Sequence, residues 1–131
     1  MSKKAVVISN TNELVRVKPE RIVYISSDGN YSIMMLHDRT KHTFVMNLSR
    51  CQEVLEAQLG REASAFIRLG RQLIVNNDYI YTLNLNKSQL VMSDMAFNRA
   101  FVLQASKKAL KQLKLLLESE TKKSVYEEQS L

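Results

Sequence analysis

The sequence holds few of the residue types from which disulfides, metal centres and catalytic sites are built. Cys51 is its only cysteine, which excludes a disulfide within the chain and a cysteine-rich metal site. The two histidines, His37 and His42, have no cysteine or carboxylate companions at ligand spacing. Neither a glycine-rich phosphate loop nor a recognisable Ser/His/Asp arrangement occurs. We therefore expect no cofactor, no metal ion and no enzymatic activity.

Long apolar segments are missing as well. No run approaches the roughly 20 apolar residues that span a bilayer, and no apolar segment long enough for a signal peptide follows the start of the chain. We therefore expect a cytoplasmic protein with no membrane segment. Hydrophobic residues nevertheless make up 45% of the 131 residues, which is ordinary for a globular core and argues against disorder. Length and composition predict a single folded domain.

Positive charge is in excess, and the excess is unevenly placed. The formal net charge is +6, from 19 Lys and Arg against 13 Asp and Glu. Residues 61–120 hold nine Lys and Arg against five Asp and Glu, whereas residues 21–60 hold four of each. A regional surplus of this kind suits contact with phosphate, although on its own it is shared by many proteins that bind no nucleic acid.

Short β-branched and aromatic segments alternate with turn residues along most of the chain, which is typical of short strands. We expect strands near residues 14–17, 21–26, 31–36, 42–46, 66–69, 72–75, 79–85, 89–92 and 99–104. Asp28-Gly29-Asn30 predicts a turn, because these residue types tolerate positive φ. Residues 1–12 contain an apolar patch at 5–8 and form either a first strand or a loosely held arm.

One helix is expected in the middle of the chain and one at its end. Ser49 followed by Gln52 gives a capping-box pattern; an apolar stripe through Cys51 follows, and Gly60 ends this helix. We therefore expect Cys51 in the core. The second helix is predicted to begin after an N-cap at Ser106. Its leucines and lysines fall on different faces: Leu110, Leu113 and Leu117 against Lys107, Lys111 and Lys114.

These patterns predict a mainly β fold with minor α. The fold is a compact domain of short antiparallel strands with one internal helix and a C-terminal helix. Residues 1–12 form the arm or first strand, residues 13–120 the domain, and residues 121–131 a polar tail that we expect to fray. The order of elements does not fit a helix-turn-helix protein.

The strongest candidate contacts flank Gly70. Arg68 and Arg71 each offer a planar fork of donors that suits phosphate oxygens or the edge of guanine. Because side chains alternate along an extended strand, the two arginines face opposite ways unless Gly70 reorients the chain. One of them is therefore a candidate structural residue, paired with Asp78 or Glu62, and the other a candidate nucleic-acid contact.

Two further places combine polar and cationic groups. Asn30-Tyr31-Ser32 follow the predicted turn and either meet DNA or serve the turn alone, with Tyr31 covering the core. Ser106-Lys107-Lys108, with Lys111 one turn later, combine the free N–H groups of a helix N-terminus with cations, which suits phosphate. The alternative for this second place is an ordinary solvated face of a basic helix.

Four segments match one known pattern in their order and spacing. They are residues 21–31 (RIVYISSDGNY), the helix at 48–59, the core that runs from Phe66-Ile67-Arg68 to Ile74-Val75-Asn76-Asn77-Asp78-Tyr79-Ile80, and Ser106-Lys107. Over residues 13–117 the chain resembles the LytTR-type DNA-binding domain of bacterial transcription regulators. The resemblance implies a domain of short antiparallel strands whose loops, rather than a recognition helix, enter the grooves of DNA. By position these loops are Asn30-Tyr31-Ser32, Gly70-Arg71-Gln72 and Ser106-Lys107-Lys108.

The function so implied is that of a sequence-specific regulator bound to double-stranded DNA, as a homodimer on two half-sites. We assign Arg71, Lys107 and Tyr31 to base edges. We assign phosphate contact or support to Arg68, Lys108, Lys111 and Asn30. A protein partner that supplies the signal is left open. A protein-interaction or inhibitory module of the same fold is the main alternative, and RNA binding is a weaker one, because no aromatic-rich sheet face is evident.

Some positions depart from the family's pattern. Family members often have histidine or another polar residue at the position of Gly70 and serine at that of Gln72, and Ser-Arg is common where this chain has Ser106-Lys107. Lysine cannot make the bidentate contact with guanine that arginine makes, so the operator sequence does not transfer. The family's regulators usually carry an N-terminal receiver domain, for which the dozen residues before the domain leave no room. We expect a stand-alone member, with an excised domain as the alternative.

Overall fold

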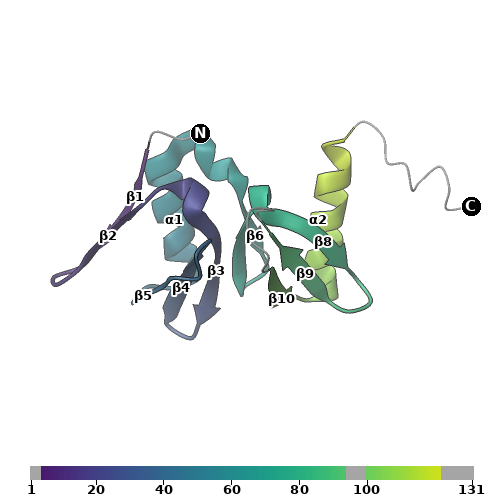
Figure 1. The fold of residues 1–131 in the computed structure, drawn as a ribbon, viewed down its shortest axis with the longest axis horizontal. Coiled ribbons are helices and arrows are strands. Elements are labelled where there is room, and N and C mark those ends of the chain that lie inside the picture. Colours follow the sequence, from purple (N-terminus) through teal and green to yellow (C-terminus); the bar gives the residue numbers. More distant parts are fainter. Residues whose placement is uncertain (1–3, 94–99, 122–131) are drawn as a thin grey trace, which may run out of the picture.

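The part of the chain described by this computed structural model, residues 4–93 and 100–121, forms three antiparallel sheets and two α-helices (Figure 1). A five-stranded sheet has the order β5-β4-β3-β7-β6, a three-stranded sheet has the order β10-β9-β8, and β1 pairs with β2. The strands are β1 (Val6–Ser9), β2 (Leu14–Val17), β3 (Ile22–Asp28), β4 (Tyr31–Leu36), β5 (Lys41–Phe44), β6 (Phe66–Leu69), β7 (Leu73–Asn76), β8 (Ile80–Asn84), β9 (Gln89–Met92) and β10 (Phe101–Gln104). The helices are α1 (Leu48–Leu59) and α2 (Lys107–Ser119). The mainly β fold with one internal and one C-terminal helix is confirmed.

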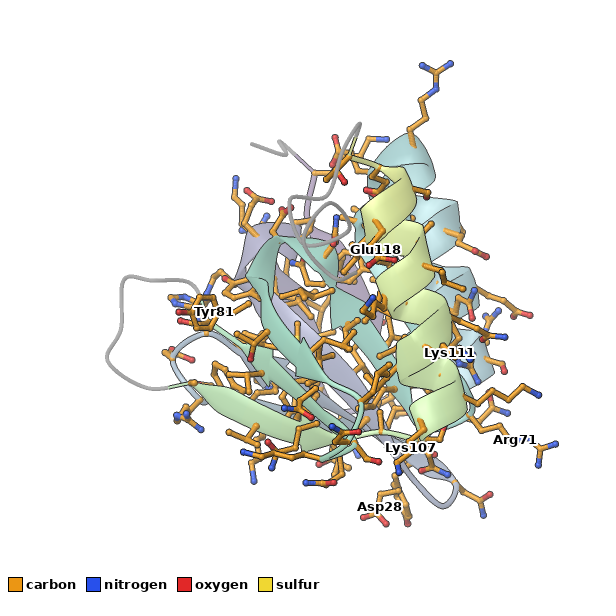
Figure 2. The ribbon with its side chains drawn as sticks, turned by 90° about the vertical axis from the view of Figure 1, so that its right-hand side faces the viewer. Asp28, Arg71, Tyr81, Lys107, Lys111 and Glu118 are labelled. Carbon is orange, nitrogen blue, oxygen red and sulfur yellow. The ribbon has the colours of Figure 1, made fainter. Side chains whose placement is uncertain are left out.

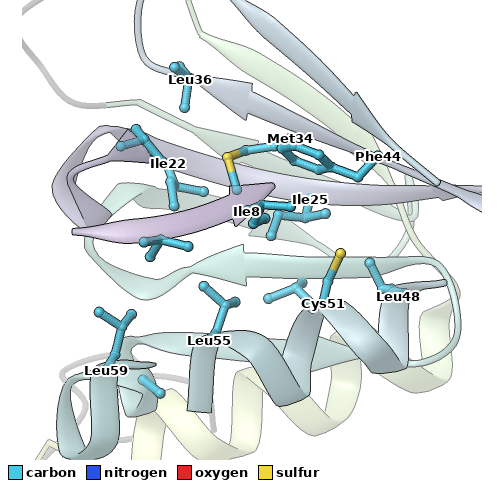
Figure 3. Packing of buried hydrophobic residues seen from close by; sticks show 14 residues of the cluster. Ile8, Ile22, Ile25, Met34, Leu36, Phe44, Leu48, Cys51, Leu55 and Leu59 are labelled. Carbon is cyan, nitrogen blue, oxygen red and sulfur yellow. The ribbon is translucent and has the colours of Figure 1, made fainter. Parts of the chain in front are cut away.

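The central strands of the five-stranded sheet are buried on both faces. In β7, Ile74 joins the core under α1, whereas Leu73 and Val75 join the core under α2, because successive side chains of a strand point to opposite faces. Figure 3 shows Leu48, Cys51, Leu55 and Leu59 of α1 pointing toward the strands of the first core. Burying each such aliphatic side chain stabilises the fold by about 1.5–3 kcal/mol. The result is one sheet held between two cores, with its strand ends left free to carry loops.

The N-terminal patch is a strand rather than an arm. Val6 is 0% exposed and Ile8 is 8% exposed. Between them, the backbone N–H of Val7 donates to Oε1 of Gln58 on α1, and Nε2 of Gln58 donates to the Val7 carbonyl, each at 2.8 Å. A side-chain amide thus continues the hydrogen bonding of an edge strand, which fixes β1 on α1.

The first helix begins two residues earlier than the capping-box pattern predicts. Asn47, and not Ser49, is the N-cap, and its side chain accepts from the backbone N–H of Arg50 at 2.8 Å. Starting at Leu48 brings this buried leucine onto the same stripe as Cys51, so burial decides between two residues that are both good caps. The predicted end of the helix is confirmed, since Gly60 follows Leu59 with φ of 58°.

The second helix has the predicted cap and the predicted faces. The side chain of Ser106 accepts from the backbone N–H of Ala109 at 3.1 Å. Leu110 and Leu113 are buried, whereas the lysines of the helix are exposed. No helix among the described residues is long and apolar enough to cross a membrane.

Most strands end within two residues of their expected positions. Between β7 and β8, residues 77–79 form a short 3-10 turn, and of these only Tyr79 was predicted as strand. Here the side chain of Asn76 accepts from the N–H of Asp78 at 3.0 Å, and the Tyr79 hydroxyl donates to the Glu20 carbonyl at 2.5 Å. Residues 94–99, which hold most of a predicted turn and the start of the last strand, and residues 122–131 of the predicted tail lie outside the described residues.

Candidate nucleic-acid interface

The three loops singled out in the sequence lie together at one end of the molecule. The backbone N–H of Ser27 donates to the carbonyl of Gln72 at 2.9 Å, which joins the end of β3 to the β6–β7 turn. That turn and the β10–α2 junction line one surface hollow, from residues 69–73 on one side and 104–106 with Ala109 on the other. Figure 2 shows Asp28, Arg71 and Lys107 at this same end. We call it the loop end.

Arg71 is free to contact a partner. It follows Gly70, whose φ of 59° lies in the left-handed region, so the chain reverses here and the strict alternation of the strands is broken. Arg71 is exposed, and Figure 2 shows its side chain extending away from the body of the protein. Within residues 4–93 and 100–121, no ion pair or side-chain hydrogen bond holds its guanidinium. Its full set of donors is therefore available.

Arg68 is half-buried, and its guanidinium is held by hydrogen bonds within the protein. Its Nε donates to the carbonyl of Gly70 at 2.8 Å, and its Nη1 donates to Oε1 of Gln52 at 2.8 Å and to Oγ of Ser49 at 3.4 Å. The predicted pairing with Asp78 or Glu62 is wrong, because the side chain reaches from the edge strand β6 across to the first turns of α1. Arg68 thus ties the β6–β7 turn to the helix.

Of the Asn30-Tyr31-Ser32 group, the first two reach the surface and the third does not. Asn30 is exposed, and Tyr31 is 46% exposed. Ser32 is 0% exposed, and its hydroxyl donates to the carbonyl of Met46 at 2.8 Å. Burial raises the pKa of the neighbouring Cys51 thiol, and a hydrogen bond with Ser32 partly offsets that rise. The pleat of β4 turns Tyr31 outward and Ser32 inward, so Ser32 is removed from the candidate contacts.

The start of α2 presents its cations to solvent. Lys107, Lys108 and Lys111 are exposed and make no ion pair with any described residue, in contrast to Lys114, whose Nζ lies 2.6 Å from Oε2 of Glu118. The oxygen of Ser106 is used as the helix cap. The first free N–H groups of the helix add partial positive charge beside these lysines, so an anion is favoured at this position.

A fourth loop at this end was missed in the sequence. The N–H of Ala105 donates to the carbonyl of Ser88 at 3.1 Å, which places the β8–β9 turn beside the start of α2. Lys87 in that turn is exposed, and its backbone N–H donates to Oδ1 of Asn84 at 3.0 Å. The sequence Asn86-Lys87-Ser88 was predicted only as a turn, and a lone lysine in a turn is too common a feature to mark a site. Lys87 becomes a candidate contact only because the bond between Ala105 and Ser88 places its turn beside the start of α2.

The fold and the loop end define a class of small β-rich domain that presents a basic surface made of loops and a helix start rather than of one long helix. The chain belongs to the LytTr DNA-binding domain family, whose model matches residues 12–118. This confirms the family resemblance that the sequence motifs indicated. Domains of this family are the DNA-binding parts of transcription regulators.

A solved structure agrees on the fold. It is the LytTr DNA-binding domain of a protein from Bacillus cereus described as a methyl-accepting/DNA response regulator. The two chains share 18% sequence identity with a TM-score of 0.61, over 88% of this chain and 98% of the other. No curated protein sequence matches this chain.

Proposed function

We propose that the protein is a sequence-specific regulator that binds double-stranded DNA through its loop end. One observation carries the proposal. Exposed cations from three separate loops, namely Arg71, Lys87 and the pair Lys107-Lys108, lie at one end of a domain whose family binds DNA. Loops held by a rigid sheet can enter a groove with defined geometry.

The contacts divide by chemistry. Lys107, Lys108 and Lys111 stand at a helix start, where they neutralise phosphates and displace counterions, which sets the position of the protein on the duplex. Arg71 is the candidate for guanine, because its free fork matches O6 and N7 in the major groove. Gln72 is also exposed, and its amide matches the adenine edge.

The other exposed side chains at the loop end are assigned to base edges or phosphates by their chemistry. Tyr31 offers a partly exposed ring beside the β3–β4 turn, which suits an apolar contact with a base edge. Asn30 in the same turn offers an amide to phosphate. Lys107 adds a single charged donor that reaches a base edge or phosphate. One small domain buries limited surface on DNA, so we propose that two copies bind two half-sites, with a protein partner supplying the signal.

Selection from a randomised duplex pool tests the proposal. The protein is titrated by fluorescence anisotropy at two salt concentrations, and the bound duplexes are sequenced. Enrichment of a motif, repeated for two half-sites, with affinity that falls as salt rises, is the expected result. Salt-sensitive binding without any enriched motif would contradict sequence-specific reading, and absence of binding at both salts would contradict DNA binding itself.

A protein-interaction module is the second candidate, favoured by one observation. Leu115 and Leu116 on α2 are 59% and 42% exposed, and such neighbouring apolar residues are typical of protein contacts. They lie toward the far end of the helix from Lys107, so this surface is compatible with bound DNA. The same titration separates the two candidates, since a pure interaction module shows no salt-dependent DNA affinity.

A further inference from the structure

The loop end carries one carboxylate, Asp28. The four loops comprise residues 27–32, 69–73, 84–89 and 104–108, and within them Asp28 is the sole acidic residue, against the cations Arg71, Lys87, Lys107 and Lys108. Asp28 is exposed at the end of β3. Figure 2 shows it at the same lower edge as Lys107.

Local structure does not explain this acid. Aspartates in turns usually accept from a backbone N–H nearby, as Asp38 does from Thr40 at 3.0 Å while it also pairs with Arg21. Asp28 makes no ion pair or side-chain hydrogen bond with any residue in 4–93 and 100–121. The β3–β4 turn is built instead by Gly29, which has φ of 64°.

The position of Asp28 beside the cationic loops means that it would affect binding to DNA. The hydrogen bond from Ser27 to Gln72 fixes the end of β3 against the β6–β7 turn. Asp28 follows Ser27 in the chain and Arg71 precedes Gln72, so the acid and the arginine lie on neighbouring loops. An exposed carboxylate among phosphate-binding cations weakens attraction to every phosphate. It therefore lowers affinity for DNA in general, unless some group of the DNA donates to it.

The bases offer such a group. An ionised carboxylate only accepts hydrogen bonds. In the major groove, cytosine presents N4–H₂ as a donor, and aspartate and glutamate are the side chains suited to it. Guanine O6 and N7 on the paired base accept, which suits Arg71. The Asp28 carboxylate accepts and the Arg71 guanidinium donates, so together they match the donor of cytosine and the acceptors of guanine in G·C pairs.

We propose that Asp28 is a specificity-determining residue that accepts a hydrogen bond from N4 of a cytosine in the operator and repels duplexes that lack a donor there. The inference rests on the proposed DNA-binding function. It differs from the role of the cations, which raise affinity for all duplexes: Asp28 lowers affinity for most sequences and spares one.

The test compares the wild-type protein with Asp28→Ala and with the near-isosteric Asp28→Asn in the same selection from randomised duplexes. Asp78→Ala is the matched control, because it removes an exposed carboxylate next to the other end of β7. Thermal melting of each variant establishes that the hairpin and the core are intact. Affinities are measured for the enriched duplex and for a scrambled one.

In the wild-type motif we expect one position that requires cytosine. Asp28→Ala should lose that requirement alone, and bind the scrambled duplex about two- to fivefold more tightly at low salt, because a repulsive surface charge is gone. Asp28→Asn should shift the preference at that position toward adenine, whose N6 and N7 suit asparagine. Asp78→Ala should keep the wild-type motif.

Two results would overturn the assignment. An unchanged motif in Asp28→Ala, with equal gains for all duplexes, would make Asp28 a repulsive charge without a reading role. If Asp28→Ala instead lost a preference for a base other than cytosine, Asp28 would read a different base from the one proposed. If the wild-type protein enriches no motif at all, the proposed function fails first, and that failure is distinct from the other two.

Discussion

Arg68 and Arg71 stand three residues apart in the same hairpin and have opposite surroundings. Arg68 makes hydrogen bonds to Gly70, Gln52 and Ser49, whereas Arg71 extends into solvent (Figure 2). Arg68 fixes the turn that carries Arg71. Identical side chains therefore serve structure in one case and, in the proposed function, recognition in the other, and the left-handed backbone of Gly70 lies between them.

The same division recurs in the other loops. Ser32 is buried and bonds to the Met46 carbonyl, while the adjacent Tyr31 is exposed. Ser106 caps α2, while the adjacent Lys107 faces solvent. Each loop thus pairs a residue that fixes the backbone with a residue that is free for a partner. Mutations of the two kinds should separate stability from DNA binding.

Arg71→Ala should give the largest loss of DNA binding. Removing a bidentate contact to guanine should weaken binding of the selected operator by about 1–3 kcal/mol and relax specificity at one position. The free energy of unfolding should stay unchanged, because Arg71 is exposed and makes no ion pair or side-chain hydrogen bond with a described residue. Anisotropy titration and chemical denaturation of the same preparation check both expectations, and wild-type affinity in the variant would exclude Arg71 from the contacts.

Arg68→Ala should show the reverse pattern. Loss of its hydrogen bonds should destabilise the fold by about 1–2 kcal/mol and weaken operator binding indirectly, with the salt dependence unchanged. Gln52→Ala removes the partner, so a double-mutant cycle on stability should be non-additive. Denaturation curves give the cycle. A slope of log affinity against log salt that becomes shallower by about 0.9 in Arg68→Ala would instead identify a phosphate contact.

Ser106→Ala tests the division at the helix start. Loss of the cap should lower the free energy of unfolding by about 1 kcal/mol, as measured by urea denaturation. Lys107→Ala, the neighbouring control, should leave stability unchanged and weaken DNA binding. If Ser106→Ala left stability intact and Lys107→Ala reduced it, the roles given to the two residues would be reversed.

Lys87→Ala should have the smallest effect, and a uniform one. If the β8–β9 turn contacts phosphate, the variant should lose affinity equally for the operator and for a scrambled duplex, and the salt slope should become shallower by about 0.9. Lys41→Ala, an exposed lysine on β5 outside the four loops, is the control. Equal slopes for wild type and Lys87→Ala would remove the fourth loop from the interface.

The sequence predicted the elements better than the partners of individual side chains. Strands, turns and helix faces follow from local periodicity, so β4, β9 and the leucine face of α2 lie where they were expected. The partners of Arg68 could not be predicted, because Gln52 lies 16 residues away on another element. Whether Asn47 or Ser49 caps the start of α1 also depends on the core against which the helix packs.

Candidate contacts could be proposed from the sequence where a loop carried its own signal. Arg71 and Lys107 stand out because glycine, serine and cations mark a turn and a helix start. Ser32 was misplaced because the side on which a strand residue points depends on the register of the sheet. Lys87 was not predicted as a contact because its position beside α2 arises from a hydrogen bond between Ala105, which follows β10, and Ser88, which precedes β9.

The most direct test of the two roles is the salt dependence of operator binding, measured in parallel with stability for wild type, Arg68→Ala and Arg71→Ala. We predict that Arg71→Ala keeps wild-type stability and loses the preference for the operator over a scrambled duplex. We predict that Arg68→Ala is less stable and retains the wild-type salt slope. A stable Arg68→Ala with a shallower slope, together with an Arg71→Ala that still prefers the operator, would contradict the division between the residue that holds the turn and the residue that reads DNA.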